Sequence, residues 1–551
     1  MPTHEVLNQP PPLADYDVFG EDAALVEGVR REGAGWAEDD LHELGVRAGT
    51  PEAIELGFQA NANPPVLRTH DRYGNRIDEI EYHPAYYELM DVAVSNGLHA
   101  APWSDERPGA HVARAAKFYV WSQVEPGHGC PISMTYAVVP ALRNQPELAA
   151  EWEPRLTART YDRRSIPATE KRGAIAGMAM TEKQGGSDVR ANTTQAVPAG
   201  GSTSSGGEYA LTGHKWFCSA PMSDLFLMLA QAPGGLSCFA VPRWRPDGTR
   251  NAIAIQRLKD KLGNRSNASS EIELDGAWGR MVGEEGRGVA TIIAMVNHTR
   301  LDCVIGASAT MRQAFAQAAH HAAHRSAFGK LLVDQPLMAN VLADLAVESE
   351  AATTVMLRLA RAYDAAAGNE SEAAFRRLAT AVAKYWVCKR QPMMVAESLE
   401  CLGGNGYVEE SIMPRLFRES PLNGIWEGSG NVICLDVLRA MAKEPQSLEA
   451  FRAEVALAAG ADARLDAAAA ALEAELGDLD DIESRARRVV ERMALVLQGS
   501  LLVRDGDPDV ADAFCASRLG GGGDSRWGAA FGTLPPGLRL DAIVERARPK
   551  S

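Results

Sequence analysis

The segment IWEGSGN places Glu427 between Trp426 and Gly428, just before a helical pattern that starts near Asn431. A carboxyl group that is partly buried at such a junction has a raised pKa, which suits it to removing a proton. Gly428 and Gly430 allow close approach of a backbone, and Asn431 offers an amide at the helix start. The pattern therefore indicates a general base at Glu427.

Two segments farther upstream have the composition of a site for a flat or anionic ligand. The first, MAMTEKQGGSD, combines two glycines with hydroxyl groups that can hydrogen-bond ring heteroatoms or carbonyls. The second, GHKWFCS, carries an indole that can stack on a planar ring. Alone, the first is more often a plain turn, and the second is more often a strand with two core aromatic residues. The candidate ligand contacts are Met178, Met180, Thr181, Gln184, Gly185, Gly186, Ser187, Trp216, Phe217 and Ser219.

A third and a fourth segment offer groups for a phosphate-bearing ligand. Arg325 and Phe328 stand in RSAFG, with Gln335 shortly after, and an arginine fork pairs well with a pyrophosphate. The alternative is a surface arginine near a helix end. Gly403 and Gly404 lie in LGGNGY, where a turn is expected.

The elements that must position these residues follow from hydrophobic periodicity. Residues 1–177 are predicted to be a mainly helical domain, and 178–288 a small antiparallel β domain or barrel of short alternating runs between glycine-rich turns. Residues 289–442 are predicted to form a helical bundle, and 443–551 an extra helical domain. The RSAFG segment is expected within a helical region, and residues 405–423 as an irregular loop.

Composition narrows the class of protein. The 551 residues carry a formal net charge of −16, which disfavours general binding to phosphate backbones. The eight cysteines form no CxxC pair, so no metal site is predicted. No apolar run reaches the roughly 18 residues of a membrane helix. The first residues lack the order of a secretory signal, so a cytoplasmic protein is expected.

Taken in order, these segments resemble the acyl-CoA dehydrogenase superfamily over roughly residues 60–442, with Trp426-Glu427-Gly428 in place of the family's Tyr-Glu-Gly. A closer likeness, over nearly the whole chain, is to the AidB branch, which is associated with the response to DNA alkylation. It rests on REGAGW near the start, CPISMT at 130–135, Lys183-Gln184, LKDKLGNRSNA at 258–268, IWEGSGN, and CLDVLR at 434–439.

The resemblance implies a fold and a reaction. The fold would be mainly α with a central β domain, plus the extra C-terminal helices, in a homotetramer. FAD would lie between the β domain and the bundle, and Glu427 would remove the α proton of an acyl thioester while a hydride leaves the β carbon. The thioester oxygen would accept hydrogen bonds from a flavin ribityl hydroxyl and the N–H of Glu427.

The resemblance also implies which residues make these contacts. Arg325, Phe328, Gln335, Gly403 and Gly404 would serve the phosphate and adenine side, partly from a neighbouring subunit. Around the base, the cofactor contacts would be Ile425, Trp426, Gly428, Ser429 and Asn431. Substrate contacts would be Thr181, Ser187, Ser219 and Asn431. Some relatives carry the base on the first helix after the β domain, but this chain has Thr299 there, which favours Glu427.

The branch is also linked to double-stranded DNA through its C-terminal domain, and Arg439 and Arg518 are candidate contacts because they lie in segments that resemble the branch's DNA-contacting region. Residues 443–551 carry 14 basic and 19 acidic residues, a poor match for a phosphate-binding face. Arg485, Arg488 and Arg492 are spaced as one basic helix stripe, with a solvated face as the alternative. Three functions stay open: an acyl-CoA dehydrogenase of full or weak activity; a DNA-associated protective or repair flavoprotein; and an acyl-CoA oxidase.

Overall fold

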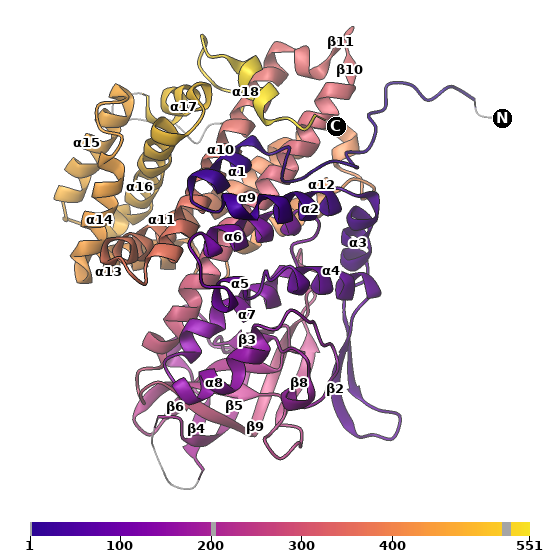
Figure 1. Cartoon of the computed structure of the whole chain (residues 1–551), viewed down its shortest axis with the longest axis vertical. Helices are drawn as coiled ribbons and strands as arrows, with labels where there is room; N and C mark the ends of the chain where they lie inside the picture. The colour runs from indigo at the N-terminus through magenta and orange to yellow at the C-terminus, as the bar shows by residue number, and fades with distance from the viewer. Residues whose placement is uncertain (1–2, 200–204, 521–529, 551) are drawn as a thin grey trace. The chain divides into compact units, whose positions relative to one another are not determined.

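The structure, a computed structural model, describes residues 3–199, 205–520 and 530–550. The chain divides into two compact units (Figure 1). Unit 1 comprises Met1–Ile54, Pro108–Val124 and Cys303–Ser551, and unit 2 comprises Glu55–Arg107 and Glu125–Asp302. The four ranges predicted from the sequence follow the order of elements along the chain, whereas the two units follow their packing.

Unit 2 is built around a β barrel. Strand β6 pairs with β3 and β7, β7 pairs with β9, β9 pairs with β5 and β8, and β5 pairs with β4, which returns to β6. The predicted β domain is confirmed, with two differences from an all-antiparallel arrangement: β3 and β4 both pair with β6 in parallel. The strands are β3 (Ala176–Ala179), β4 (Gln195–Pro198), β5 (Glu208–Ser219), β6 (Leu225–Ala232), β7 (Gly235–Pro242), β8 (Ile253–Leu258) and β9 (Ser269–Val282).

The interior of the barrel is apolar, and short helices accompany it in unit 2. Tyr209, Phe226 and Phe239 are among the buried side chains that fill the barrel. The helices and the remaining hairpin are α3 (Pro51–Ala62, which begins in unit 1), β1 (Val66–His70), β2 (Arg76–Glu81), α4 (Pro84–Ser95), α5 (Ala101–Ser104), α7 (Gly129–Leu142) and α8 (Pro146–Leu156). The hairpin β1–β2 was not predicted, because its charged side chains hide the apolar alternation.

Unit 1 is helical, and prolines mark the start of several of its helices. Pro336, Pro445 and Pro508 stand at first-turn positions, where proline lacks only a hydrogen bond that the helix would not make. The helices are α1 (Ala23–Arg31), α2 (Glu38–Ala48), α6 (Ala110–Ser122), α9 (Gly288–His324, which begins in unit 2), α10 (Pro336–Ala365), α11 (Glu370–Cys401), α12 (Met413–Glu419), α13 (Gly430–Lys443), α14 (Pro445–Ala456), α15 (Ala463–Gly477), α16 (Ile482–Asp505), α17 (Pro508–Phe514) and α18 (Leu540–Ala547).

One local element of unit 1 was not predicted, and one local prediction is wrong. The RSAFG segment does not continue a helix: α9 ends at His324, and a hairpin follows, β10 (Ser326–Ala327) paired with β11 (Lys330–Leu331). Phe328 and Gly329 form its turn with positive φ values of 53° and 81°. The stretch expected as an irregular loop contains α12, whose interior-facing residues Met413 and Leu416 are buried.

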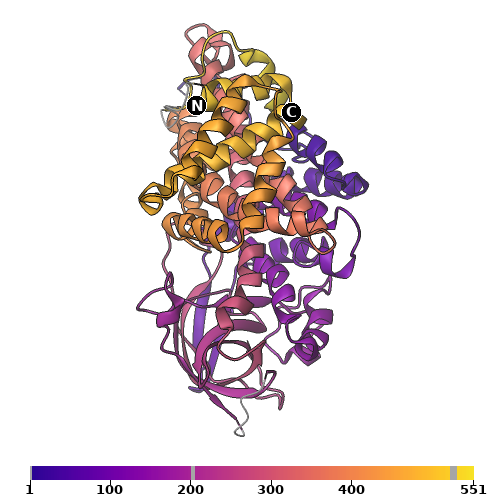
Figure 2. The same ribbon diagram turned by 90° about the vertical axis from the view of Figure 1, so that its left-hand side faces the viewer.

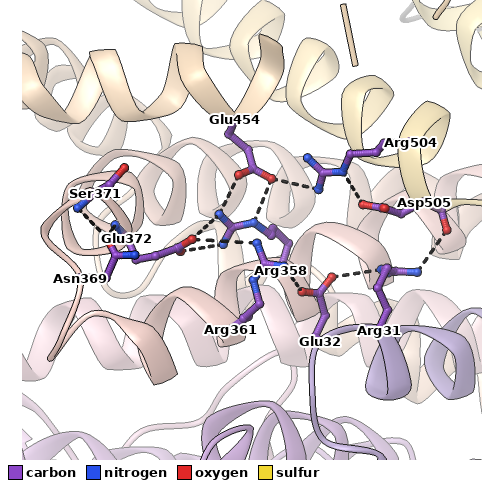
Figure 3. Close-up of polar contacts among 10 residues, drawn as sticks. All are labelled: Arg31, Glu32, Arg358, Arg361, Asn369, Ser371, Glu372, Glu454, Arg504 and Asp505. Carbon is purple, nitrogen blue, oxygen red and sulfur yellow. Dashed lines mark hydrogen bonds and ion pairs between the residues drawn. The ribbon is translucent and has the colours of Figure 1, made fainter. Parts of the chain in front are cut away.

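The C-terminal helices α14 and α16 pack on α11 within unit 1 (Figure 2). A buried network joins them to the bundle. Arg358 of α10, 2 % exposed, binds Glu372 of α11 and Glu454 of α14, and Arg504 of α16 binds the same Glu454 (Figure 3). The extra C-terminal helices are therefore part of the same packed unit as the bundle. Within the described residues, no helix is both long and apolar enough to span a membrane.

Candidate active site

In unit 2 the barrel brings together the two segments that were predicted to contact a flat ligand. The N–H of Trp216 donates to the carbonyl of Thr181 at 2.8 Å, so the loop after β3 lies directly beside the end of β5. The N–H of Lys183 donates to Nε2 of His214 at 3.0 Å. Tertiary structure thus joins residues more than thirty positions apart into one surface.

Glu182 anchors this loop from beneath. Its carboxylate accepts hydrogen bonds from the backbone and hydroxyl of Thr193 and of Thr194, and from Nζ of Lys215 at 2.8 Å. Burial alone would raise the pKa of Glu182, but these donors outweigh it and hold the pKa well below its usual range. The neighbouring Gln184 and Ser187 face solvent. The loop therefore has a rigid base and an accessible rim.

The aromatic pair at the end of β5 is only partly covered. Trp216 is half-buried, and the ammonium of Lys259 lies 3.3 Å from the centroid of its indole. The side chain of Phe217 is exposed, which is unusual for a phenylalanine in a barrel strand. The hydroxyl of Ser219 lies 3.3 Å from that of Ser269. These residues form a surface with free aromatic area and a hydroxyl group beside it.

A steric constraint explains why position 186 is a glycine. A Cβ at this position would lie 2.5 Å from Oγ1 of Thr181 and 2.9 Å from its Cγ2. Only glycine leaves the Thr181 side chain where it is. Met178, in β3, is buried, whereas Met180 and Thr181 are half-buried. The loop thus presents its backbone and the Thr181 hydroxyl without an intervening side chain.

In unit 1, Glu427 lies in the short turn that precedes α13, as predicted. Its backbone is left-handed, with φ of +57°, and Gly428 follows with φ of +106°. A glutamate rarely adopts this conformation, which costs of order 1–3 kcal/mol and is typical of functional sites. The Glu427 side chain is half-buried. The chain therefore holds Glu427 in a conformation that it would not adopt in isolation.

Helix α11 supports this turn from one side. Nζ of Lys384, a residue 1 % exposed, donates to the carbonyl oxygen of Trp426 at 2.9 Å and to that of Gly428. Nε1 of Trp426 donates to Oδ1 of Asn423 at 2.9 Å, and Asn423 in turn donates to Oε1 of Gln391 at 3.3 Å. Both flanks of Glu427 are therefore tied to α11.

The start of α13 is crowded by two other helices. An ideal Cβ on Gly430 would meet Cε of Lys389 at 3.4 Å, a ring carbon of Tyr385 at 3.5 Å and Nη2 of Arg487 at 3.5 Å. Arg487 belongs to α16, so a C-terminal helix reaches the segment that carries Glu427. Asn431, at the exposed start of α13, and Ser429, half-buried, complete the turn.

The predicted phosphate-side residues lie in another part of unit 1. Arg325 donates to the carbonyl of Asn8, and Gln335 donates to the carbonyl of Ala327 at 3.1 Å. Phe328 is fully exposed at the tip of the hairpin, and nothing lies within 4 Å of a Cβ built on Gly403 or Gly404. Within one chain, Phe328 and the two glycines have open surface in front of them, whereas Arg325 and Gln335 are half-buried.

Most of one half of helix α11 lies between the turn at Gly403 and the base. Lys384 marks the position of Glu427 on α11, and Gly403 follows the end of this helix at Cys401. At 1.5 Å per residue, Lys384 and Cys401 are about 25 Å apart along the axis. The turn at Gly403 and the base at Glu427 thus lie at separate places along the same helix.

The two arginines predicted to contact DNA, Arg439 and Arg518, differ in their exposure. Arg439, on α13, has an exposed side chain. The prediction for Arg518 is wrong as a surface contact, because its guanidinium is fully buried and pairs with Asp344 at 2.5 Å and Glu348 at 3.2 Å. The basic stripe is partly neutralised, since Glu475 lies 2.7 Å from Arg488 and 2.5 Å from Arg492.

Three residues that support the site were not predicted from the sequence. Glu182 stood in a quoted motif without a role, and Lys384 and Asn423 were not considered. A lysine within the run TAVAKYWVC was a usable signal, because a lone charge in an apolar helix needs a buried partner. Thr299 stands at the position where some relatives carry the base. Its hydroxyl donates to the carbonyl of Val296 at 3.0 Å.

Known proteins share this architecture. Three family models match: adaptive response protein AidB N-terminal domain (residues 8–163), acyl-CoA dehydrogenase middle domain (177–277) and acyl-CoA dehydrogenase C-terminal domain (286–442). The putative acyl-CoA dehydrogenase AidB of Escherichia coli is 46 % identical over 94 % of both chains.

Two solved structures extend the comparison. Caenorhabditis elegans ACDH-11 in complex with C11-CoA is 28 % identical, with a TM-score of 0.84 over 94 % of both chains. A Bacillus anthracis acyl-CoA dehydrogenase complexed with FAD, 20 % identical, has a TM-score of 0.63 over 78 % of this chain and 80 % of that one, and shares the fold.

Proposed function

The chain belongs to the acyl-CoA dehydrogenase family, in its AidB branch, and on that premise we propose that it catalyses FAD-dependent α,β-dehydrogenation of an acyl thioester with Glu427 as the base. The observation that carries this assignment is the left-handed backbone of Glu427 in the turn before α13. Strain of this kind persists where the surrounding structure imposes it, and it clusters at functional sites. The crystallised relative with C11-CoA supports an acyl-CoA as the substrate class.

FAD is the cofactor of this family, and the residues of unit 2 fit a flavin. The fit rests on the loop at Gly186, where the absence of a Cβ leaves the Thr181 hydroxyl in place, and on the exposed ring of Phe217 beside the half-buried Trp216. Met178, Met180, Thr181, Gln184, Gly185, Gly186, Ser187, Trp216, Phe217 and Ser219 would hold the ring system. When bound, FAD supplies the acceptor for the hydride that leaves the β carbon.

The residues of the chain supply the proton chemistry. Glu427 takes the α proton of the thioester, and the N–H of Glu427 donates to the thioester oxygen, where negative charge develops. Thr181, Ser187, Ser219 and Asn431 contribute polar contacts to the substrate. Ile425, Trp426, Gly428 and Ser429 would line the cofactor beside the base.

The remaining cofactor contacts are proposed to come from a second copy of the chain. The residues concerned are Arg325, Phe328, Gln335, Gly403 and Gly404. Phe328 and the two glycines present open surface, and the turn at Gly403 lies away from Glu427 along α11. A neighbouring subunit that offers these residues to the flavin of the first is consistent with both observations. A homotetramer in the cytoplasm is part of the same proposal.

Anaerobic titration of the FAD-loaded protein with acyl-CoAs of different chain length tests the proposal. Bleaching of the flavin absorbance is expected with at least one of them. Glu427→Gln is expected to keep FAD and to lose bleaching, whereas the exposed Glu410→Gln should behave as wild type. Absence of bleaching with every acyl-CoA refutes dehydrogenation, and unchanged reduction in Glu427→Gln refutes the assigned base.

A second candidate function is association with double-stranded DNA during the response to alkylation, with dehydrogenation residual. The exposed Arg439 on α13, the helix that follows Glu427, favours it, whereas the acidic C-terminal range and the burial of Arg518 do not. The test is binding to a DNA duplex at low and high salt. Binding that weakens with salt and in Arg439→Ala supports this function, and no binding at low salt rejects it.

A further inference from the structure

Lys384 is an unusual lysine. It lies in the middle of α11, is 1 % exposed, and within the part of the chain that the structure describes it has no carboxylate partner. Its Nζ instead donates to two carbonyl oxygens, those of Trp426 and Gly428. Burying an ammonium group without a counter-ion is unfavourable, so strong hydrogen bonds must compensate for the lost hydration.

The two carbonyls belong to the residues immediately before and after Glu427 in the sequence. The first belongs to the peptide that precedes Glu427, and the second to the peptide that follows Gly428. For both oxygens to converge on one ammonium group, the residues between them must turn sharply, and both have positive φ, +57° and +106°. Gly428 adopts such a value freely, whereas Glu427 does so against its own preference.

A cation at this point also removes a repulsion. Two carbonyl oxygens that approach the same point bring the negative ends of their dipoles together, and a positive charge between them reverses the sign of that interaction. Without the ammonium group the turn would open, and the backbone of Glu427 would relax toward a common conformation. Lys384 thus accounts for the strained geometry.

The trans peptide between Trp426 and Glu427 fixes the direction of the Glu427 N–H. The N–H of Glu427 and the carbonyl of Trp426 point in opposite directions within one planar unit. Because the carbonyl points at Lys384, the N–H points away from α11. A hydrogen bond from a cation to the carbonyl also polarises the peptide, which makes its N–H a stronger donor.

We propose that Lys384 is a positioning residue that clamps the peptides around Glu427, and so sets the direction of its carboxylate and aims and strengthens its N–H as a donor to the thioester oxygen. The catalytic part rests on the function proposed above. The structural part, the clamp on a left-handed glutamate, is independent of what Glu427 does.

The catalytic part is tested with Lys384→Met, which keeps the length of the side chain and removes its donors. The matched control is Lys117→Met, a second buried lysine of unit 1, whose partner is Asp40. In Lys384→Met we expect FAD content and acyl-CoA affinity within about threefold of wild type and flavin reduction slower by about 100-fold, by analogy with loss of one preorganised donor. Reduction within about twofold of wild type overturns the catalytic part, as does an equal effect in Lys117→Met.

The structural part is tested by thermal unfolding in two backgrounds. If the clamp serves the left-handed glutamate, Lys384→Met lowers the melting temperature more in the wild-type chain than in the Glu427→Gly background, where the turn needs no restraint. An equal loss in both backgrounds, or failure of the Glu427→Gly, Lys384→Met protein to fold, assigns Lys384 to general core stability and overturns the clamp. This measurement needs no activity, so it remains decisive if no acyl-CoA bleaches the flavin.

Discussion

Glu182 and Lys215 form an ion pair at 2.8 Å in which neither side chain exposes any surface. The pair connects the loop after β3 to β5, the two elements that carry the residues proposed to hold the flavin ring. Four further donors from Thr193 and Thr194, and Nε2 of Gln184 at 2.8 Å, also bind the carboxylate. A buried charge with this many partners is stable only as long as all of them are present.

Glu182→Gln is therefore expected to destabilise the protein by about 3–5 kcal/mol, because it leaves the Lys215 ammonium buried without its counter-charge. Urea unfolding followed by circular dichroism measures the loss, and the protein should retain less FAD after purification. Glu208→Gln, which changes an exposed glutamate on β5, is the control and should cost less than about 0.5 kcal/mol. Equal stability of the two variants would show that the pair contributes nothing.

The stability contributed by the Glu182–Lys215 pair should depend on pH. Because the folded-state pKa of Glu182 lies below the ordinary value of 4.5, the carboxylate contributes stability that is complete above that pH and is lost as the pH falls through the folded pKa. The difference in unfolding free energy between wild type and Glu182→Gln is expected to shrink from pH 6 to about pH 3. Denaturation curves across this range test the sign, and a difference that grows in acid contradicts it.

Arg358→Met is expected to destabilise unit 1 by about 3–5 kcal/mol, since it leaves the carboxylates of Glu372 and Glu454 without their shared partner. The pKa of Glu454, which burial would raise and Arg358 lowers, should rise in the variant. Thermal unfolding and protease sensitivity near residue 444 measure the effect.

The control is Arg452→Met, which removes an exposed ion pair with Glu473 and should cost no more than about 1 kcal/mol. If Arg358→Met were as stable as this control, the buried network would not hold α14 to the bundle.

Glu427→Gly is expected to raise the stability of the protein by up to about 1 kcal/mol while it abolishes reduction of the flavin by acyl-CoA. Glycine adopts a φ of +57° without strain, although it loses more backbone entropy on folding. Chemical denaturation of the FAD-loaded protein measures the gain. A clear loss of stability would show that Glu427 makes contacts worth more than its backbone strain.

The sequence predicted the elements of the barrel and the bundle well, because their signal is local. Alternating runs such as Leu236 to Val241 correspond to β7, and the helical periods correspond to α10, α11 and α16. It was less successful where the determining contacts are distant. The RSAFG segment forms a hairpin that is hydrogen-bonded to Asn8 through Arg325 and Ser326. The residues near 326 give no sequence signal for that distant contact.

For the candidate site, the sequence alone determined the types of groups: the carboxylate at Glu427, the glycines and hydroxyls of the loop after β3, and the indole of Trp216. Only the tertiary structure decided how they are held. It buried Arg518, which residue type had suggested for a DNA surface, and it placed Lys384 on the carbonyls beside Glu427. Burial and long-range hydrogen bonds depend on which distant elements pack together, and that information is not contained in any single segment.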